Sequence, residues 1–154
     1  MNIIDSLFGK KKTFKHPIIG VLKSQRIRGV NHTKSYTWHG NIFLKNQLLE
    51  TTIILEGNNT SPFPNHLDFI SQLVSNWENE YLPKIENKIN DTGIDNIGKY
   101  SNWKNDFYLS AIYPMNNKNS EFELTLEPID KTKTNSIGIE IKNNIITKIE
   151  KYES

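Results

Sequence analysis

The order of its periodic segments is the feature that most constrains the fold of this chain. Short stretches that alternate between apolar and polar residues, as a strand with one buried face does, lie on both sides of one long amphipathic segment. In residues 65–90, apolar side chains recur every three or four positions, which predicts a helix with one apolar stripe. The stripe consists of Leu67, Ile70, Leu73, Val74, Trp77, Tyr81, Ile85 and Ile89.

Local signals indicate where this helix starts, bends and stops. Asn65 is the predicted N-cap, because its side-chain oxygen can accept a hydrogen bond from the first free N–H groups. Pro83 lies inside the stripe. It should kink or split the helix near Leu82, since proline has no N–H and its ring collides with the preceding turn. The polar run from Asn90 to Gly93 is expected to end the helix.

Two predicted β sections, residues 14–57 and 105–152, flank the helix. The first is expected to contain a strand from Ile18 to Lys23, a polar loop over residues 25–34 and further strands after it. In the second, Asn143-Asn144 predicts a two-residue hairpin turn, because asparagine tolerates positive φ.

These elements predict an α+β fold in a single domain of residues 1–154. About seven strands should form an antiparallel sheet, either one curled sheet or two sections, packed on the central helix. A short N-terminal helix is expected over residues 2–8. A chain of 154 residues can bury a core without disulfides or a metal.

Composition excludes several classes of protein. The chain has no cysteine, which rules out a disulfide framework, a thiolate zinc site and a cysteine nucleophile. It also has no apolar run of the length that spans a membrane. Its first apolar stretch contains Asp5 and precedes its lysines, the reverse of the order in a secretory signal. We therefore expect a cytoplasmic protein.

No pattern of residues predicts catalysis, a metal or a cofactor. The nucleophile-elbow, phosphate-loop and dinucleotide-binding motifs do not occur in the sequence. The four histidines have no metal-ligand spacing, although three of them could still converge on zinc from separate loops. They are His16, His32, His39 and His66. We expect a protein that is not an enzyme.

Charge is distributed unevenly along the chain. Residues 1–50 hold nine basic and two acidic residues, a net charge of +7, whereas residues 51–154 hold ten basic and fifteen acidic residues, a net charge of −5. This asymmetry predicts two electrostatically different faces. The basic set that could bind an anionic partner consists of Lys10, Lys11, Lys12, Lys15, Arg26 and Arg28.

An acidic row is the main candidate contact surface. Glu121, Glu123 and Glu127 share the outward face of one predicted strand, and Glu140 lies nearby if the strands pair in order. Such a row is either a solvated face that blunts edge pairing or a docking face for a basic protein. Trp103 lies in a polar stretch and is the best candidate for an exposed aromatic anchor, with burial under a loop as the alternative.

Several short motifs occur together in this chain. They are Phe8-Gly9, Phe14-x-His16-Pro17-x-x-Gly20-x-Leu22, Trp38-x-Gly40, Trp77-x-x-x-Tyr81-x-Pro83 and Glu121-x-Glu123-Leu124-x-Leu126. Together they resemble a family of small bacterial proteins known only as a domain of unknown function, of the type that provides immunity to polymorphic toxins. The resemblance implies a stoichiometric inhibitor that binds a toxin domain and blocks its active site or the access of its substrate. It implies no catalytic residue.

The leading functional prediction is therefore an immunity protein that neutralises a cognate toxin domain without catalysis. Its predicted contact residues are Glu121, Glu123, Glu127, Glu140 and Trp103. The alternative is a peripheral membrane or nucleic-acid adaptor that acts through the basic set, whose binding would weaken as salt rises.

Overall fold

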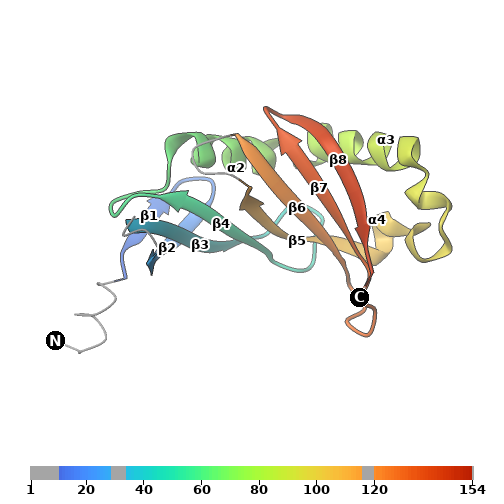
Figure 1. The fold of residues 1–154 in the computed structure, drawn as a ribbon, viewed down its shortest axis with the longest axis horizontal. Helices are drawn as coiled ribbons and strands as arrows, with labels where there is room; N and C mark the ends of the chain where they lie inside the picture. Colours follow the sequence, from blue (N-terminus) through green and yellow to red (C-terminus); the bar gives the residue numbers. More distant parts are fainter. Residues whose placement is uncertain (1–10, 29–33, 116–119, 154) are drawn as a thin grey trace.

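The computed structural model of the protein describes residues 11–28, 34–115 and 120–153, and it describes only the backbone of residues 26–28, 34 and 35. The predicted N-terminal helix and Lys10 lie outside these residues. The described chain forms one eight-stranded sheet in which the strands follow the order of the sequence (Figure 1). The strands are β1 (Thr13–His16), β2 (Gly20–Arg28), β3 (Lys34–Ile42), β4 (Thr51–Gly57), β5 (Phe107–Pro114), β6 (Glu121–Pro128), β7 (Ser136–Lys142) and β8 (Ile145–Tyr152).

The two predicted β sections join into this single sheet. Strands β1–β4 and β5–β8 each form an antiparallel meander. The meanders meet where β4 and β5 pair in parallel, through Thr52 beside Ala111 and Ile53 beside Ile112. A parallel pair requires a long crossover, and the helical segment provides it. The α+β prediction is thus confirmed, with one parallel joint in an otherwise antiparallel sheet.

The crossover helix lies along one side of the sheet (Figure 1). It consists of α2 (Pro64–Asn76), a π-helical turn η1 (Trp77–Tyr81) and α3 (Leu82–Thr92). Two 3₁₀ turns, η2 (Ile94–Asn96) and η3 (Gly98–Tyr100), and the short helix α4 (Trp103–Asp106) lead back to β5. The apolar stripe faces the sheet, where the ring of Phe69 stacks on that of Phe122 at 4.1 Å between centroids.

The helix is distorted near Pro83, as predicted, and the distortion is the π turn η1. The N–H of Leu82 donates to the carbonyl of Trp77, five residues back, in the turn just before the proline. The turn also keeps the apolar stripe on one side of the helix. From Leu73 to Ile89 its buried members are four residues apart, and each such step overshoots a full turn of an α-helix by about 40°. One additional residue in a wide turn removes much of that drift, so the stripe keeps facing the sheet.

Some predicted boundaries are wrong. Asn65 is not the N-cap, because the helix begins at Pro64 after Phe63, and proline suits a first turn whose N–H groups have no helical partner. The sheet has eight strands rather than about seven, since His16 and Pro17 lie at a hairpin turn between β1 and β2. The predicted polar loop over residues 25–34 is shorter, because β2 continues to Arg28. Residues 105 and 106 belong to α4, not to a strand.

Residues from two of the motifs, His16 and Leu22 in one and Gly40 in the other, have structural roles in this hairpin and the next strand. His16 Nδ1 accepts hydrogen bonds from the N–H groups of Ile18 and Ile19, at 3.2 and 3.3 Å, and so closes the turn. On the next strand, a Cβ at position 40 would lie 2.6 Å from Leu22 Cδ2. Gly40 therefore makes room for the fully buried side chain of Leu22.

Strand β8, at one edge of the sheet, is irregular. Lys148 lies opposite Glu140 and Ile146 lies opposite Ile141, which leaves Thr147 as an additional residue in a β-bulge. Near the end of the strand, Lys151 lies opposite the buried Ile137, on the side that faces the helices.

Candidate functional site

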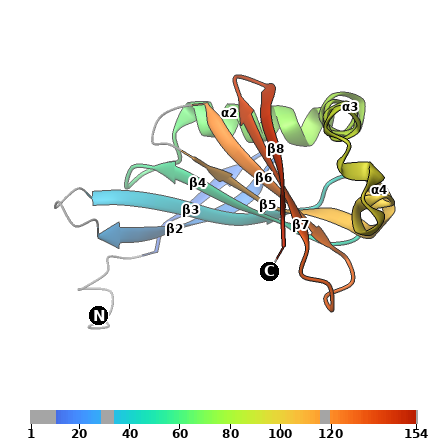
Figure 2. The same ribbon diagram turned by 45° about the vertical axis from the view of Figure 1, so that its right-hand side comes forward.

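The side of the sheet opposite α2 and α3, which we call the open face, is the candidate site (Figure 2). On β6, Phe122, Leu124 and Leu126 are buried toward the helices. The alternate residues Glu121, Glu123, Thr125 and Glu127 face the other way and are half-buried. Helices therefore cover one face of the sheet, and the charged side chains of β6 lie on the other.

The strand register brings the four predicted glutamates together. Glu123 lies directly opposite Glu140 across β6 and β7, which confirms the predicted proximity of these two residues. The other three predicted glutamates, and Glu150 of β8, each form an ion pair with a lysine. The ion pairs are Glu121 with Lys142, Glu127 with Lys131 at 3.4 Å, Glu140 with Lys148 at 3.9 Å, and Glu150 with Lys148 at 2.5 Å.

Two tyrosines complete the centre of this surface. Tyr113 on β5 lies opposite Glu123, and Tyr152 on β8 donates a hydrogen bond to Glu150 at 3.2 Å. A Cβ at position 138 would collide with the ring of Tyr152 and lie 3.1 Å from a carboxylate oxygen of Glu123. Gly138 thus allows the Tyr152 ring to lie across β7 beside Glu123. We call Tyr113, Glu123, Gly138 and Tyr152 the tyrosine–glutamate cluster.

The cluster is desolvated enough to change the acidity of its phenols. Burial is the main cause that raises the pKa of Tyr113 to about 12, and the hydrogen bond and negative charge of Glu123 add to it. Burial and the charge of Glu123 also raise the pKa of Tyr152. Both phenols therefore stay protonated and can donate hydrogen bonds at neutral pH.

We expect the raised pKa of Tyr113 to appear as a loss of stability in alkali. Because its folded-state pKa lies above the unfolded value of about 10, the stabilisation is complete below about pH 10 and is lost as the pH rises toward 12. Urea unfolding of the wild type and of Tyr113→Phe at a series of pH values measures this. The variant should lose less stability over this range. If the free energy of unfolding fell equally with pH in both proteins, the stabilisation assigned to Tyr113 would be wrong.

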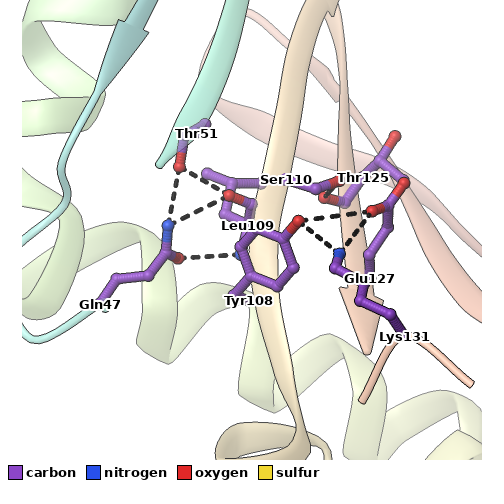
Figure 3. Close-up of polar contacts among 8 residues, drawn as sticks. All are labelled: Gln47, Thr51, Tyr108, Leu109, Ser110, Thr125, Glu127 and Lys131. Atoms are coloured by element: carbon purple, nitrogen blue, oxygen red, sulfur yellow. Dashed lines mark hydrogen bonds and ion pairs between the residues drawn. The ribbon is translucent and has the colours of Figure 1, made fainter. Parts of the chain in front are cut away.

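A third phenol, Tyr108 of β5, lies on the same face opposite Glu127, near the end of β6 (Figure 3). The Tyr108 hydroxyl accepts a hydrogen bond from Lys131 Nζ at 2.8 Å, and the same ammonium lies 4.5 Å from the centroid of the Tyr108 ring. Glu127 Oε2 lies 3.5 Å from the Tyr108 hydroxyl. We call the whole surface the charged array. Its members are Tyr108, Tyr113, Glu121, Glu123, Glu127, Lys131, Glu140, Lys142, Lys148, Glu150 and Tyr152.

A polar contact of Gln47 joins the two meanders beside Tyr108 (Figure 3). The carboxamide of Gln47, in the loop between β3 and β4, donates to the carbonyl of Leu109 at 3.2 Å and accepts from its N–H at 2.9 Å. It also donates to Thr51 Oγ1, whose own hydroxyl donates to the Leu109 carbonyl at 2.6 Å. Gln47 therefore continues the short parallel pairing of β4 with β5. The sequence predicts only a turn at Asn46-Gln47, because a contact 62 residues away has no local signal.

The first meander contributes a less charged half to the open face. His39 on β3 and Glu56 on β4 are both half-buried there. Burial lowers the pKa of His39 and raises the pKa of Glu56, so each neutral form is favoured more than in water. This half therefore differs from the charged array in electrostatic character.

Trp103 does not belong to this surface: of the two positions that the sequence leaves open, exposure as an anchor and burial, the structure shows burial. Its side chain is only 5% exposed, because α4 turns it toward the core. The neighbouring residues Asn102, Lys104 and Asn105 remain exposed, which explains why the stretch is polar in sequence.

Part of the basic set lies at the other edge of the sheet. Lys11, Lys12 and Lys15 are exposed on β1 and just before it. The backbone of Arg26 and Arg28 lies in β2, where it pairs with β3. These residues lie at the opposite end of the strand order from the charged array.

The three histidines among the described residues do not gather, and the fourth, His32, lies outside these residues. His16 closes the turn after β1, His39 lies on β3, and His66 is fully buried on α2, where its Nδ1 accepts from the N–H of Glu56 at 3.2 Å. In the described part of the chain, no three His, Asp or Glu side chains are placed to hold a metal ion. The helices of this part are each too short or too polar to cross a membrane.

Comparison of the chain with protein-family models, with curated proteins and with solved structures finds no match.

Proposed function

We propose that this protein is an immunity protein that binds a cognate bacterial toxin domain and neutralises it without catalysis, using the open face of the sheet. The observation that supports this proposal is the one-sided architecture. The helices bury one face of the sheet, and the other presents phenols, carboxylates and ammonium groups held in a fixed arrangement.

Pre-organisation makes such a face suitable for recognition. The side chains of the array already hold one another by hydrogen bonds and ion pairs, so little conformational entropy remains to be lost on binding. Tyrosine is a frequent anchor at protein interfaces, because its ring buries a large area and its hydroxyl pairs with polar groups.

The charge of the array indicates the chemistry of the partner surface. Five glutamates lie with three lysines, a net charge of −2, and the tyrosine–glutamate cluster has no lysine of its own among the described ion pairs. A lysine or arginine of the toxin domain can pair with Glu123 there and lie against the ring of Tyr152.

Capture from the native host tests the proposal. The tagged protein should retain one stoichiometric partner that mass spectrometry identifies as the toxin domain of a large secreted protein, and the partner's toxic activity should disappear in the complex. A variant with the charges of Glu123 and Glu140 reversed serves as the matched bait and should lose this partner. Capture of no partner by the wild type would contradict the proposal.

Exposure of Lys11, Lys12 and Lys15 at the β1 edge favours the alternative function, a peripheral membrane or nucleic-acid adaptor. In that case the protein should occur in the membrane or nucleic-acid fraction of the host. Its binding to anionic vesicles or oligonucleotides should weaken as salt rises.

A further inference from the structure

A cavity of about 120 Å³ lies where the β3–β4 loop, η1, α4 and the start of β5 meet, and Tyr108 is the one member of the charged array among its lining residues. Its walls are apolar side chains of the core. Trp77 and Trp103, from η1 and α4, are 6% and 5% exposed, so each indole borders the cavity while most of it stays packed. The other apolar walls are Leu82, Phe107, Leu109 and Leu126.

The rim of the cavity is polar, and its charges are already paired. Lys45 of the loop forms an ion pair with Glu78 of η1 at 2.8 Å, and Asn46 donates a hydrogen bond to the same carboxylate. Lys104 on α4 pairs with Glu86 on α3. These contacts connect the loop to η1 and α4 to α3. All three charged residues that line the cavity, Lys45, Glu78 and Lys104, are therefore paired.

The walls are held in place by features described above. Gln47 lines the cavity, and its carboxamide is fixed against the backbone of Leu109 on the opposite side. Trp77 and Glu78 belong to the π turn, and Leu82 follows it directly. Single π turns inside helices occur frequently at functional sites, because they change the direction of a few side chains without ending the helix.

We propose that this cavity is a binding site for a small neutral molecule with a single aromatic ring. An apolar cavity of about 150 Å³ can hold benzene, and the cavity here, which has a polar rim, is of comparable size. Two indoles border the cavity, and aromatic rings attract one another in edge-to-face and offset-stacked arrangements. An ionised ligand is disfavoured, because it would lose its hydration against apolar walls and find the rim charges already paired. The Gln47 amide and Asn46 can instead pair with a hydroxyl on the ring.

Phenol is a suitable probe, and the three tryptophans give the readout. In two-dimensional NMR spectra, the indole N–H signals of Trp77 and Trp103 should shift with phenol and approach saturation. The signal of Trp38 should stay in place, since this residue lies in β3, outside the cavity, and donates to the carbonyl of Asn58. Benzoate should produce much smaller shifts. Equal shifts at all three tryptophans, or shifts that rise linearly without saturation, would overturn the proposal.

A variant that fills the cavity adds a second test. Leu82→Phe places additional volume at the cavity wall, and Leu67→Phe makes the same change on a half-buried leucine of α2 that does not line it. Phenol should bind about tenfold or more weakly to Leu82→Phe and with unchanged affinity to Leu67→Phe. Unchanged phenol binding by a folded Leu82→Phe variant would place the ligand elsewhere and overturn the assignment.

Discussion

Replacing Gln47 by alanine is expected to lower the free energy of unfolding by about 2–4 kcal/mol. The substitution removes the two hydrogen bonds with the backbone of Leu109, the one to Thr51 and the one to the carbonyl of Leu49. The Leu109 carbonyl keeps the hydroxyl of Thr51, but its N–H loses the acceptor that Gln47 supplied. Loss of a hydrogen bond costs about 1 kcal/mol, and a buried donor left without a partner costs about 1–3 kcal/mol. Urea unfolding followed by circular dichroism measures the change.

Two further substitutions separate this effect from a general loss of polar contacts. Gln47→Glu keeps an acceptor for the Leu109 N–H but places a carboxylate oxygen against the Leu109 carbonyl, so it should also destabilise the protein. Asn41→Ala removes one exposed hydrogen bond to Glu50 and should change stability by less than about 0.5 kcal/mol. If Gln47→Ala were as mild as Asn41→Ala, the proposed role of Gln47 at the joint would be wrong.

Reversing two charges in the array should have the largest effect on binding. We expect Glu123→Lys with Glu140→Lys to weaken affinity for the toxin domain on the order of 100-fold, equal to about 2.7 kcal/mol. The two positions lie opposite each other in the sheet, so the substitution creates one positive patch where the partner's cation would sit. Isothermal calorimetry with the captured partner measures the affinity, and thermal unfolding verifies that the variant is folded.

Asp68→Lys with Asp91→Lys is the matched control. It changes the net charge by the same amount at two exposed positions on α2 and α3, far from the open face in the fold. Its affinity should stay within about threefold of the wild type, since long-range charge effects are screened by salt. Equal losses in both variants would mean that net charge, not this site, governs binding. An unchanged affinity in the first variant would remove the array from the interface.

Regular patterns in the sequence predict much of the fold. The predicted apolar stripe of the helix is correct, because the residues that recur every three or four positions are also the ones that pack against the sheet. The hairpin turn at Asn143-Asn144 is also confirmed, with φ values of 49° and 63°. Strict alternation on β6 predicts which glutamates face outward, and the sequential order of the strands brings Glu140 beside Glu123. These features are local, or they follow from short connections.

Features that depend on contacts between distant residues could not be predicted. The parallel joint requires Gln47 to contact Leu109, and neither residue belongs to a recognisable motif. Trp103 appears exposed in sequence because polar residues surround it, yet one turn of helix directs it into the core. The π turn did have a signal, the repeated spacing of four residues from Leu73 to Ile89, which an ideal α-helix cannot keep on one face.

The irregular strand β8 has a consequence for how the molecule behaves in a crowded solution. The free edge of a sheet is a template for strand addition and hence for aggregation. In β8 the bulge at Thr147 interrupts the row of backbone hydrogen-bonding groups along the edge. Lys151 places a charge on the side of the sheet that faces the helices, where an added strand would bury it. At the opposite edge, β1 has only four residues. Both edges are therefore poor templates for the addition of a further strand, which opposes polymerisation.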